Sequence, residues 1–151
     1  MTESERIIAF TEQRTLALAG ASRNGKKFGN TLLKDLANKG YTVHPVHPSA
    51  ESIDGVRAFP SLAALPEAVG GLVLVVPPAE SEKLVREAAD AGIPRIWMQQ
   101  GAESPEAIRL CEERGLECTH GYCLLMFADP VNSIHRVHRW FAKVFGKLPK
   151  E

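Results

Sequence analysis

The sequence predicts an α/β fold, in which a doubly wound parallel sheet carries helices on both faces. Short apolar runs alternate along the chain with segments whose apolar residues recur at helical spacing, and this alternation is typical of parallel sheets with right-handed crossovers. Residues 72–76 are apolar throughout, as expected of a strand buried on both faces. We find no linker or repeat, so residues 1–151 are predicted to form a single domain.

The first half of the chain alternates helix and strand. Residues 2–5 (TESE) are typical of a helix start, and Gly40 is placed to end a later helix whose leucines share one face. The predicted elements are, in order, a lead-in helix over residues 3–12, a strand over about 15–20, a helix over 30–39, a strand over 41–46, a short strand over 56–59 and a helical turn over 61–65.

The second half continues the alternation. Pro77 and Pro78 stop a strand, Gly92 and Gly115 close helices, and Pro105 suits a first helical position. The predicted elements are a strand over residues 72–76, a helix over 79–91, a strand over 95–98, a helix from 104 to 115, a short strand over 116–119 and a C-terminal helix over 131–145.

In such sheets, ligands bind outside the carboxyl ends of the strands. The loops predicted at that edge are rich in small, polar or proline residues, and they cover residues 20–29, 46–49, 76–79, 98–101 and 119–124. The first of these loops joins a strand to a helix. This arrangement can place backbone N–H groups and a helix N-terminus against a phosphate.

The loop over residues 20–29 has further features of a phosphate site. Gly20 permits a close backbone approach, and Ser22 can donate a hydrogen bond to a phosphate oxygen. Three cations follow within five residues: Arg23, Lys26 and Lys27. We therefore predict a phosphorylated, adenine-containing cofactor here, the alternative being an ordinary solvated loop. The loop is not GxGxxG, and residues 47–49 (HPS) lack the carboxylate that holds the ribose of NAD, which argues against NAD.

Composition narrows the class of protein. Hydrophobic residues make up 44% of the 151 and charged residues 24%, an ordinary globular balance. The 18 basic and 18 acidic residues cancel, so nucleic acid is not an expected partner. No apolar run approaches the ~20 residues that span a bilayer, and no signal peptide is evident. The three cysteines lack CxxC spacing, which favours reduced thiols and a cytoplasmic location.

Six segments together resemble a known family. They are GAS at 20–22, Lys27 ahead of the helix, PVHP at 45–48, VVPPAE at 75–80, AADAGIPRIWMQQGAES at 88–104 and GYCLLMF at 121–127. Over residues 14–127 the chain is similar to the small single-domain CoA-binding proteins, which look like the CoA-binding N-terminal domain of the succinyl-CoA synthetase alpha subunit. IWMQQG is the most specific segment. The resemblance implies a Rossmann-like fold that binds coenzyme A or an acyl-CoA.

The resemblance, together with the loop residues above, predicts a set of ligand-binding residues: Gly20, Ala21, Ser22, Lys26, Lys27, Pro48, Val76, Pro77, Met98, Gln99, Gly101 and Cys123. The synthetase's phosphorylated histidine lies in a second domain, so the resemblance implies CoA binding without the ligase reaction. Two positions depart from the family pattern. His47 replaces the usual Asn, and Phe28-Gly29 replaces a proline and a serine, which should make the first loop more flexible.

Several residues have competing interpretations. Pro77 offers either a flat apolar wall to the ligand or a simple strand stop, and Gln99 can donate to and accept from pantetheine amides. Trp97 is predicted to be core. Cys123, on a glycine-flanked loop, is either an inert packing residue or a thiol that forms a mixed disulfide or thioester with CoA. The other two cysteines, Cys111 and Cys118, are predicted to be structural.

The C-terminal segment is predicted to be an amphipathic helix that packs on the sheet or on a second copy of the chain. His135 and His138 share a helical face, but they lack the further ligands of a zinc site. Three functions remain open from the sequence: a non-catalytic or regulatory CoA-binding module, an NAD(P)-dependent oxidoreductase or acyl-CoA-handling enzyme, and an interaction protein.

Overall fold

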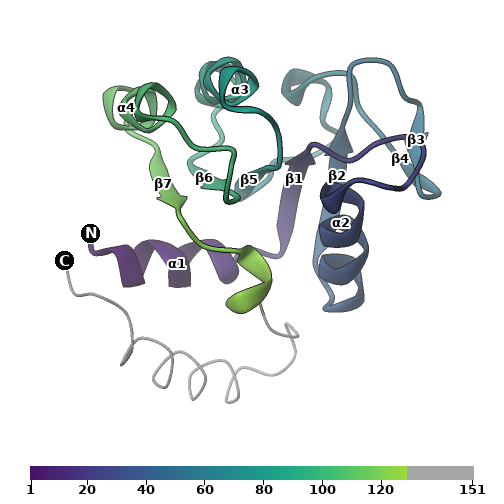
Figure 1. Ribbon diagram of the computed structural model, residues 1–151, viewed down its shortest axis with the longest axis horizontal. Helices are drawn as coiled ribbons and strands as arrows, with labels where there is room; N and C mark the ends of the chain where they lie inside the picture. The colour runs from purple at the N-terminus through teal and green to yellow at the C-terminus, as the bar shows by residue number, and fades with distance from the viewer. Residues whose placement is uncertain (129–151) are drawn as a thin grey trace.

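The computed structural model describes residues 1–128 (Figure 1). A five-stranded, all-parallel sheet has the strand order β2-β1-β5-β6-β7. Its strands are β1 (Thr15–Ala19), β2 (Thr42–Val46), β5 (Gly71–Leu74), β6 (Arg95–Met98) and β7 (Glu117–His120). The predicted doubly wound parallel sheet is confirmed, with strand ends that differ from the predicted ones by one or two residues.

Helices cover both faces of the sheet, as predicted. They are α1 (Glu3–Thr11), α2 (Phe28–Asn38), α3 (Pro78–Asp90) and α4 (Pro105–Glu113). The first two pack on one face and the last two on the other (Figure 1). The predicted helix over 131–145, and with it the predicted contact between copies of the chain, lies outside the described residues. Within residues 1–128, no helix has the length and apolarity needed to cross a membrane.

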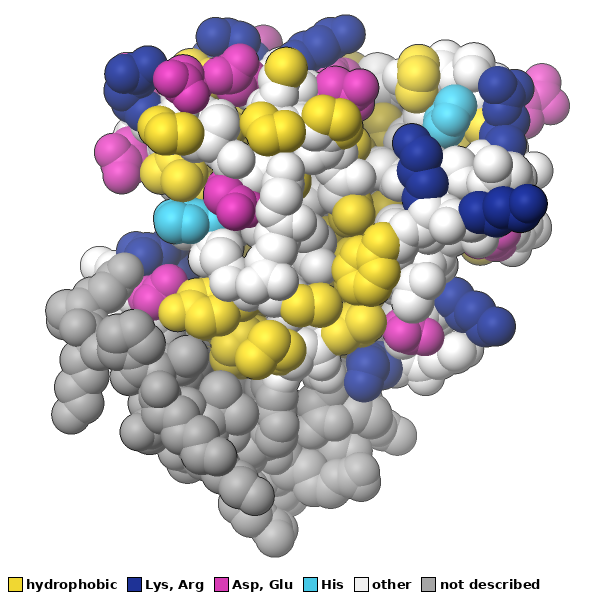
Figure 2. All heavy atoms as spheres, viewed as in Figure 1, with side chains coloured by type: hydrophobic (Ala, Val, Ile, Leu, Met, Phe, Trp, Pro, Cys, Tyr) yellow, Lys and Arg dark blue, Asp and Glu magenta, His cyan; other side chains and the backbone are white. Residues whose placement is uncertain are grey.

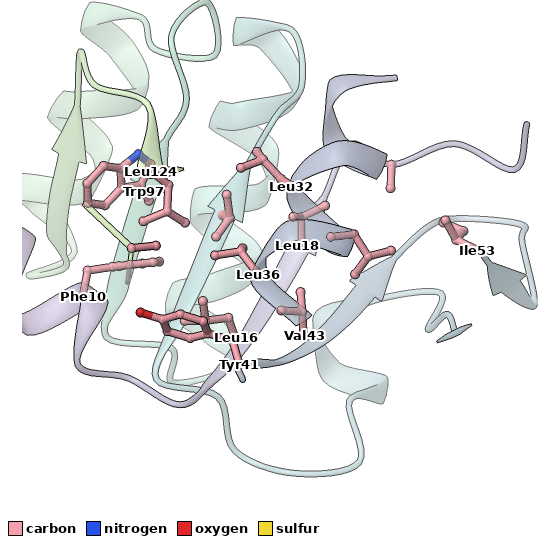
Figure 3. Packing of buried hydrophobic residues seen from close by; sticks show 14 of the residues in the cluster. Phe10, Leu16, Leu18, Leu32, Leu36, Tyr41, Val43, Ile53, Trp97 and Leu124 are labelled. Carbon is pink, nitrogen blue, oxygen red and sulfur yellow. The ribbon is translucent and has the colours of Figure 1, made fainter. Parts of the chain in front are cut away.

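Strand β1 shows why both faces are apolar. Leu16 and Leu18 point toward α2, whereas Ala17 and Ala19 point toward the helices of the opposite face, because successive side chains of a strand alternate. Figure 3 shows Leu32 and Leu36 of α2 packed over these leucines and Val43 of β2. Because a layer of helices covers each face of the strand, the side chains on both faces are buried. The strand therefore appears in the sequence as a continuous apolar run.

Trp97 anchors the same core layer near its centre, as predicted. Its ring is fully buried and lies 5.4 Å from the ring of Phe10 and 6.0 Å from that of Phe127, centroid to centroid (Figure 3 shows the first pair). The indole Nε1 donates to the carbonyl oxygen of Tyr122 at 3.1 Å, so the buried polar atom of the ring is satisfied.

A small hairpin replaces the single strand predicted over residues 56–59. Strands β3 (Ser52–Ile53) and β4 (Val56–Arg57) pair in antiparallel fashion around a two-residue turn. Both turn residues have positive φ, 49° at Asp54 and 78° at Gly55, which is typical of a tight type I′ hairpin. The chain then returns to the main sheet, where Phe59 bridges Val46 of β2. Two single turns complete the fold, η1 (Leu62–Ala64), as predicted, and η2 (Leu124–Met126).

The strand order fixes the topological switch point. From β1 the chain moves outward to β2, and from β5 it moves the other way to β6 and then β7. The carboxyl ends of β1 and β5 therefore face the crevice in which doubly wound sheets bind their ligands. Two of the predicted loops, over residues 20–29 and 76–79, leave the sheet at this point.

Candidate functional site

Two glycines let the chain turn sharply at the switch point. Gly20 has a φ of 122°, and a Cβ atom there would lie 2.2 Å from the carbonyl oxygen of Val75 at the end of β5. A Cβ at Gly29 would lie 2.5 Å from the carbonyl oxygen of Gly20. The expectation that Gly29 loosens the loop is therefore wrong. Gly29 is buried, and its missing side chain allows the start of α2 to pack directly on the end of β1.

Asn30, in the first turn of α2, organises the loop ahead of it. Its side chain is 4% exposed. The Oδ1 atom accepts from the backbone N–H groups of Ser22 at 2.9 Å and Lys27 at 3.3 Å. The Nδ2 atom donates to the carbonyl oxygen of Ser22 at 2.9 Å and to the carboxylate of Asp54 at 2.9 Å. One buried amide thus joins the loop, the helix and the β3–β4 hairpin.

Ser22 does not have the free donors that the sequence suggested. Its N–H is bound to Asn30, and its hydroxyl donates to Oδ1 of Asn24 at 2.6 Å. The open backbone donors lie instead at the start of α2, because the first N–H groups of a helix have no intrahelical acceptor. Lys27, the N-cap residue, makes no side-chain cap hydrogen bond. The N–H groups of Phe28 and Gly29 are therefore the ones placed to meet an anion.

Cations surround this helix start. Arg23, Lys26 and Lys27 are all exposed, and Arg57 of β4 is exposed on the neighbouring hairpin. Figure 2 shows Lys and Arg side chains gathered on the side of the molecule where Figure 1 places the hairpin and the beginning of α2. The positive end of the helix dipole adds to this potential, and the carboxylate of Asp54, which accepts from Asn30, is an opposing charge on the hairpin.

A cavity of about 690 Å³ opens between the end of β2 and the hairpin. It is lined by Pro48, Ser49 and Arg57, among others. His47 shapes its floor, because the ring Nδ1 accepts from the backbone N–H groups of Ser49 at 3.1 Å and Ala50 at 2.9 Å. The histidine that replaces the family's usual asparagine thus holds the loop through its own ring nitrogen.

The β5–α3 turn offers apolar surface rather than donors. Val76 is half-buried and Pro77 is exposed, and the turn contacts the loop after β1 through Val75 and Gly20. Phe28 adds a ring that is 48% exposed at the start of α2. Exposed cations and apolar side chains therefore meet at the switch point.

The predicted residues at the end of β6 behave differently. Met98 is fully buried in the core between the sheet and α3 and α4, so its side chain offers no surface to a ligand. Gln99 is 3% exposed. Its Oε1 accepts from the N–H of Leu124 at 2.7 Å, and its Nε2 donates to the sulfur of Cys123 at 3.4 Å. Gln99 therefore holds the loop after β7, while Gly101 is exposed in the loop after β6.

The structure also brings to this edge of the sheet three residues that the sequence did not single out: Asn30, Asp54 and Arg57. The Asp-Gly pair at residues 54–55 is a hairpin signal that could have revealed the last two. No local signal marks Asn30, since its burial depends on a hairpin 24 residues further along the chain.

Comparisons with known proteins agree with this geometry. A family model described as a CoA binding domain matches residues 14–129. Among curated relatives, the alpha subunit of an ADP-forming acetate–CoA ligase II from Pyrococcus furiosus is 26% identical over 94% of this chain and 32% of its own length. The uncharacterized protein YneT from Bacillus subtilis is 27% identical over 74% of this chain and 82% of its own length. The chain spans less than a third of the acetate–CoA ligases that it matches.

Solved structures share the fold. A conserved hypothetical protein from Pyrococcus furiosus is 43% identical, with a TM-score of 0.71 over 74% of this chain and 97% of its own. A hypothetical protein from Pyrococcus horikoshii is 26% identical, with a TM-score of 0.76 over 91% of this chain and 93% of its own. The family model covers the whole sheet, and these structures share the Rossmann-like topology of the chain. The chain therefore belongs to the CoA-binding domain family.

Proposed function

We propose that this protein binds coenzyme A or an acyl-CoA at the switch point between β1 and β5, without catalysing a reaction on it. The observation that carries the proposal is the start of α2. This helix begins at the carboxyl end of β1 without a side-chain cap, and Asn30 holds the loop that precedes it. Its open N–H groups and dipole suit the pyrophosphate of CoA.

The surrounding residues favour CoA over NAD. Residues 47–49 at the end of β2 supply no carboxylate for a ribose diol. The adjacent cavity is lined by Arg57 and Ser49, and also by Glu51, and the Arg57 guanidinium suits a ribose phosphate better than a neutral hydroxyl. The apolar surface of Val76 and Pro77 would lie along the pantetheine arm. The same argument disfavours an NAD-dependent oxidoreductase.

The thiol at this edge has little to activate it. Cys123 is half-buried, and its side-chain partner in the described part of the chain is the amide of Gln99 rather than a base. A thiol without a neighbouring base or cation is a weak nucleophile at neutral pH. This supports a binding role. The three cysteines are free, which supports the proposed cytoplasmic location.

One observation favours a second candidate. Several curated relatives are ADP-forming acetate–CoA ligases, of which this chain matches one part. The protein would then supply the CoA site of a larger acyl-CoA ligase. An assay for acetyl-CoA synthesis from ATP, acetate and CoA distinguishes this candidate: turnover by the purified chain would overturn the non-catalytic proposal.

A calorimetric titration tests the binding proposal directly. CoA, dephospho-CoA, NAD and ATP are titrated into the full chain, and CoA is expected to bind most tightly. Lys27→Ala should weaken CoA about tenfold, because it removes a cation at the helix start. Lys34→Ala is the matched control, since Lys34 is exposed two turns further along the same helix.

The titration also has clear contrary results. Tighter binding of NAD than of CoA would overturn the choice of ligand. Equal losses in Lys27→Ala and Lys34→Ala would show that general charge, and not the start of α2, attracts the ligand. Dephospho-CoA that binds as well as CoA would remove the role given to Arg57.

A further inference from the structure

Two cysteines predicted to be structural lie together at the far edge of the sheet, two strands away from β5. Cys111 is in the last part of α4 and is fully buried, whereas Cys118 is in β7 and is half-buried. The carbonyl oxygen of Cys111 accepts from the N–H of Leu116 at 2.8 Å. This bond folds the chain back so that the end of α4 lies on β7, and the side chain of Cys118 packs against the same apolar cluster that contains Cys111.

Solvent reaches one thiol of the pair. Strand β7 is at the edge of the sheet, and Figure 1 shows α4 and α1 lying on either side of it. A pocket of about 330 Å³ opens there, lined by Cys118, Arg6 and His120 among others. Cys111 does not line this pocket. Cys118 therefore borders an open pocket, whereas Cys111 is fully buried.

The electrostatics distinguish the two thiols in the same way. The neighbouring Cys111 thiol and the guanidinium of Arg6 lower the pKa of Cys118, against the burial that raises it. The Cys118 thiol, followed by burial, raises the pKa of Cys111. Glu112 of α4 opposes thiolate formation at both sulfurs. A thiolate next to a cation, accessible to solvent and backed by a second thiol, is the arrangement of redox-active cysteines.

We propose that Cys118 is a peroxide-reactive thiol and that Cys111 is its resolving partner. The Cys118 thiolate attacks the nearer oxygen of a peroxide, ROOH, and becomes a sulfenic acid, while the O–O bond breaks and ROH leaves after taking a proton. The Cys111 thiol then attacks the sulfenic sulfur, a disulfide forms, and water leaves. In total the pair loses two electrons to one peroxide. The site lies apart from the proposed CoA site and does not depend on it.

Peptide mapping of the full chain tests the proposal. The Cys123→Ser variant is treated with one equivalent of hydrogen peroxide, and remaining thiols are blocked with iodoacetamide. Arg114 lies between the two cysteines, so trypsin places them on peptides 110–114 and 115–136. We expect these peptides to be joined by a disulfide, with an intact mass lower by two hydrogen atoms. The reaction should be at least about tenfold faster than that of N-acetylcysteine, because more of the thiol is ionised.

The order of events has its own test. In Cys111→Ala, made in the same Cys123→Ser background, dimedone should trap a sulfenic acid on Cys118. In the matching Cys118→Ala variant no adduct should form on Cys111. Melting curves of the reduced variants check that each is folded, and if either is not, the Cys123→Ser result decides alone. Both thiols still free after treatment, or oxidation at the rate of N-acetylcysteine, would overturn the proposal.

Discussion

The turns before α2 and α4 leave the same edge of the sheet, from β1 and β6, yet only one of the two helices begins with a side-chain cap. At α4 the N-cap residue is Ser104, whose hydroxyl accepts from the N–H of Ala107 at 3.0 Å. Pro105 follows and has no N–H to satisfy. At α2 the N-cap residue is Lys27, which makes no side-chain cap. One helix start is closed by its own sequence and the other is left for an external acceptor.

The difference shows how the fold separates stability from binding. A capped helix start contributes about 1 kcal/mol to stability, and α2 forgoes that contribution. Its loop is stabilised by other means, since Asn30 joins residues 22 and 27 to the hairpin. Because the buried amide of Asn30 holds the loop in place, the N–H groups at the start of α2 can remain free.

The steric basis of the open turn is tested by Gly20→Ala. The added Cβ would lie 2.2 Å from the carbonyl oxygen of Val75, and the backbone has a φ of 122°. We expect a loss of about 3 kcal/mol in the free energy of unfolding, from strain and overpacking together. Urea denaturation measures it. Gly92→Ala is the control, because Gly92 has a φ of 77° but open space around it, and should cost about 1 kcal/mol. Equal losses in the free energy of unfolding of the two variants would contradict the close approach of Gly20 to Val75.

The support behind the loop is tested by Asn30→Ala. The change leaves the N–H of Ser22 without its acceptor in a part-buried position, so we expect a loss of about 2 kcal/mol in stability and about tenfold weaker CoA binding. Asn24→Ala is matched in chemistry but exposed, and it should cost less than about 1 kcal/mol. A larger loss of stability in Asn24→Ala than in Asn30→Ala would mean that the exposed Asn24, and not the buried Asn30, supports the loop.

The contrast also explains what could be predicted from the sequence. Strand and helix order followed from apolar periodicity, because both faces of each central strand are covered by helices. The loop contacts did not follow, because they depend on tertiary position. Ser22 has the chemistry of a phosphate ligand but donates to Asn30 and Asn24. Met98 follows a family motif but faces the core between the sheet and α3 and α4. Residue type directed the prediction to the carboxyl-terminal edge of the sheet, whereas the distances between side chains show which donors at that edge are already bound.

A side-chain cap at the start of α2 should raise the stability of the protein and weaken its binding of CoA. Lys27→Ser places a hydroxyl at the N-cap of α2, where it can accept from an N–H of the first turn. In the absence of ligand, the variant should gain about 0.5 to 1 kcal/mol in stability. CoA should bind about tenfold more weakly, since the hydroxyl occupies a donor and a cation is lost. Calorimetry and urea denaturation measure the two effects. Lys34→Ser, on the same helix, serves as the control. Unchanged affinity for CoA in Lys27→Ser would refute the proposal that the uncapped start of α2 binds the ligand.

Removing the cap from the closed helix start should have the smallest effect and should leave binding alone. In Ser104→Ala the N–H of Ala107 loses its acceptor, which should lower stability by about 1 kcal/mol. The dissociation constant for CoA should stay within about twofold of the original value, because α4 starts away from the β1–β5 crevice and distant sites contribute independently. Calorimetry on the same protein preparation measures both quantities. A marked loss of affinity would mean that the starts of α2 and α4 act as one anion site, and the contrast between an open and a closed helix would then fail.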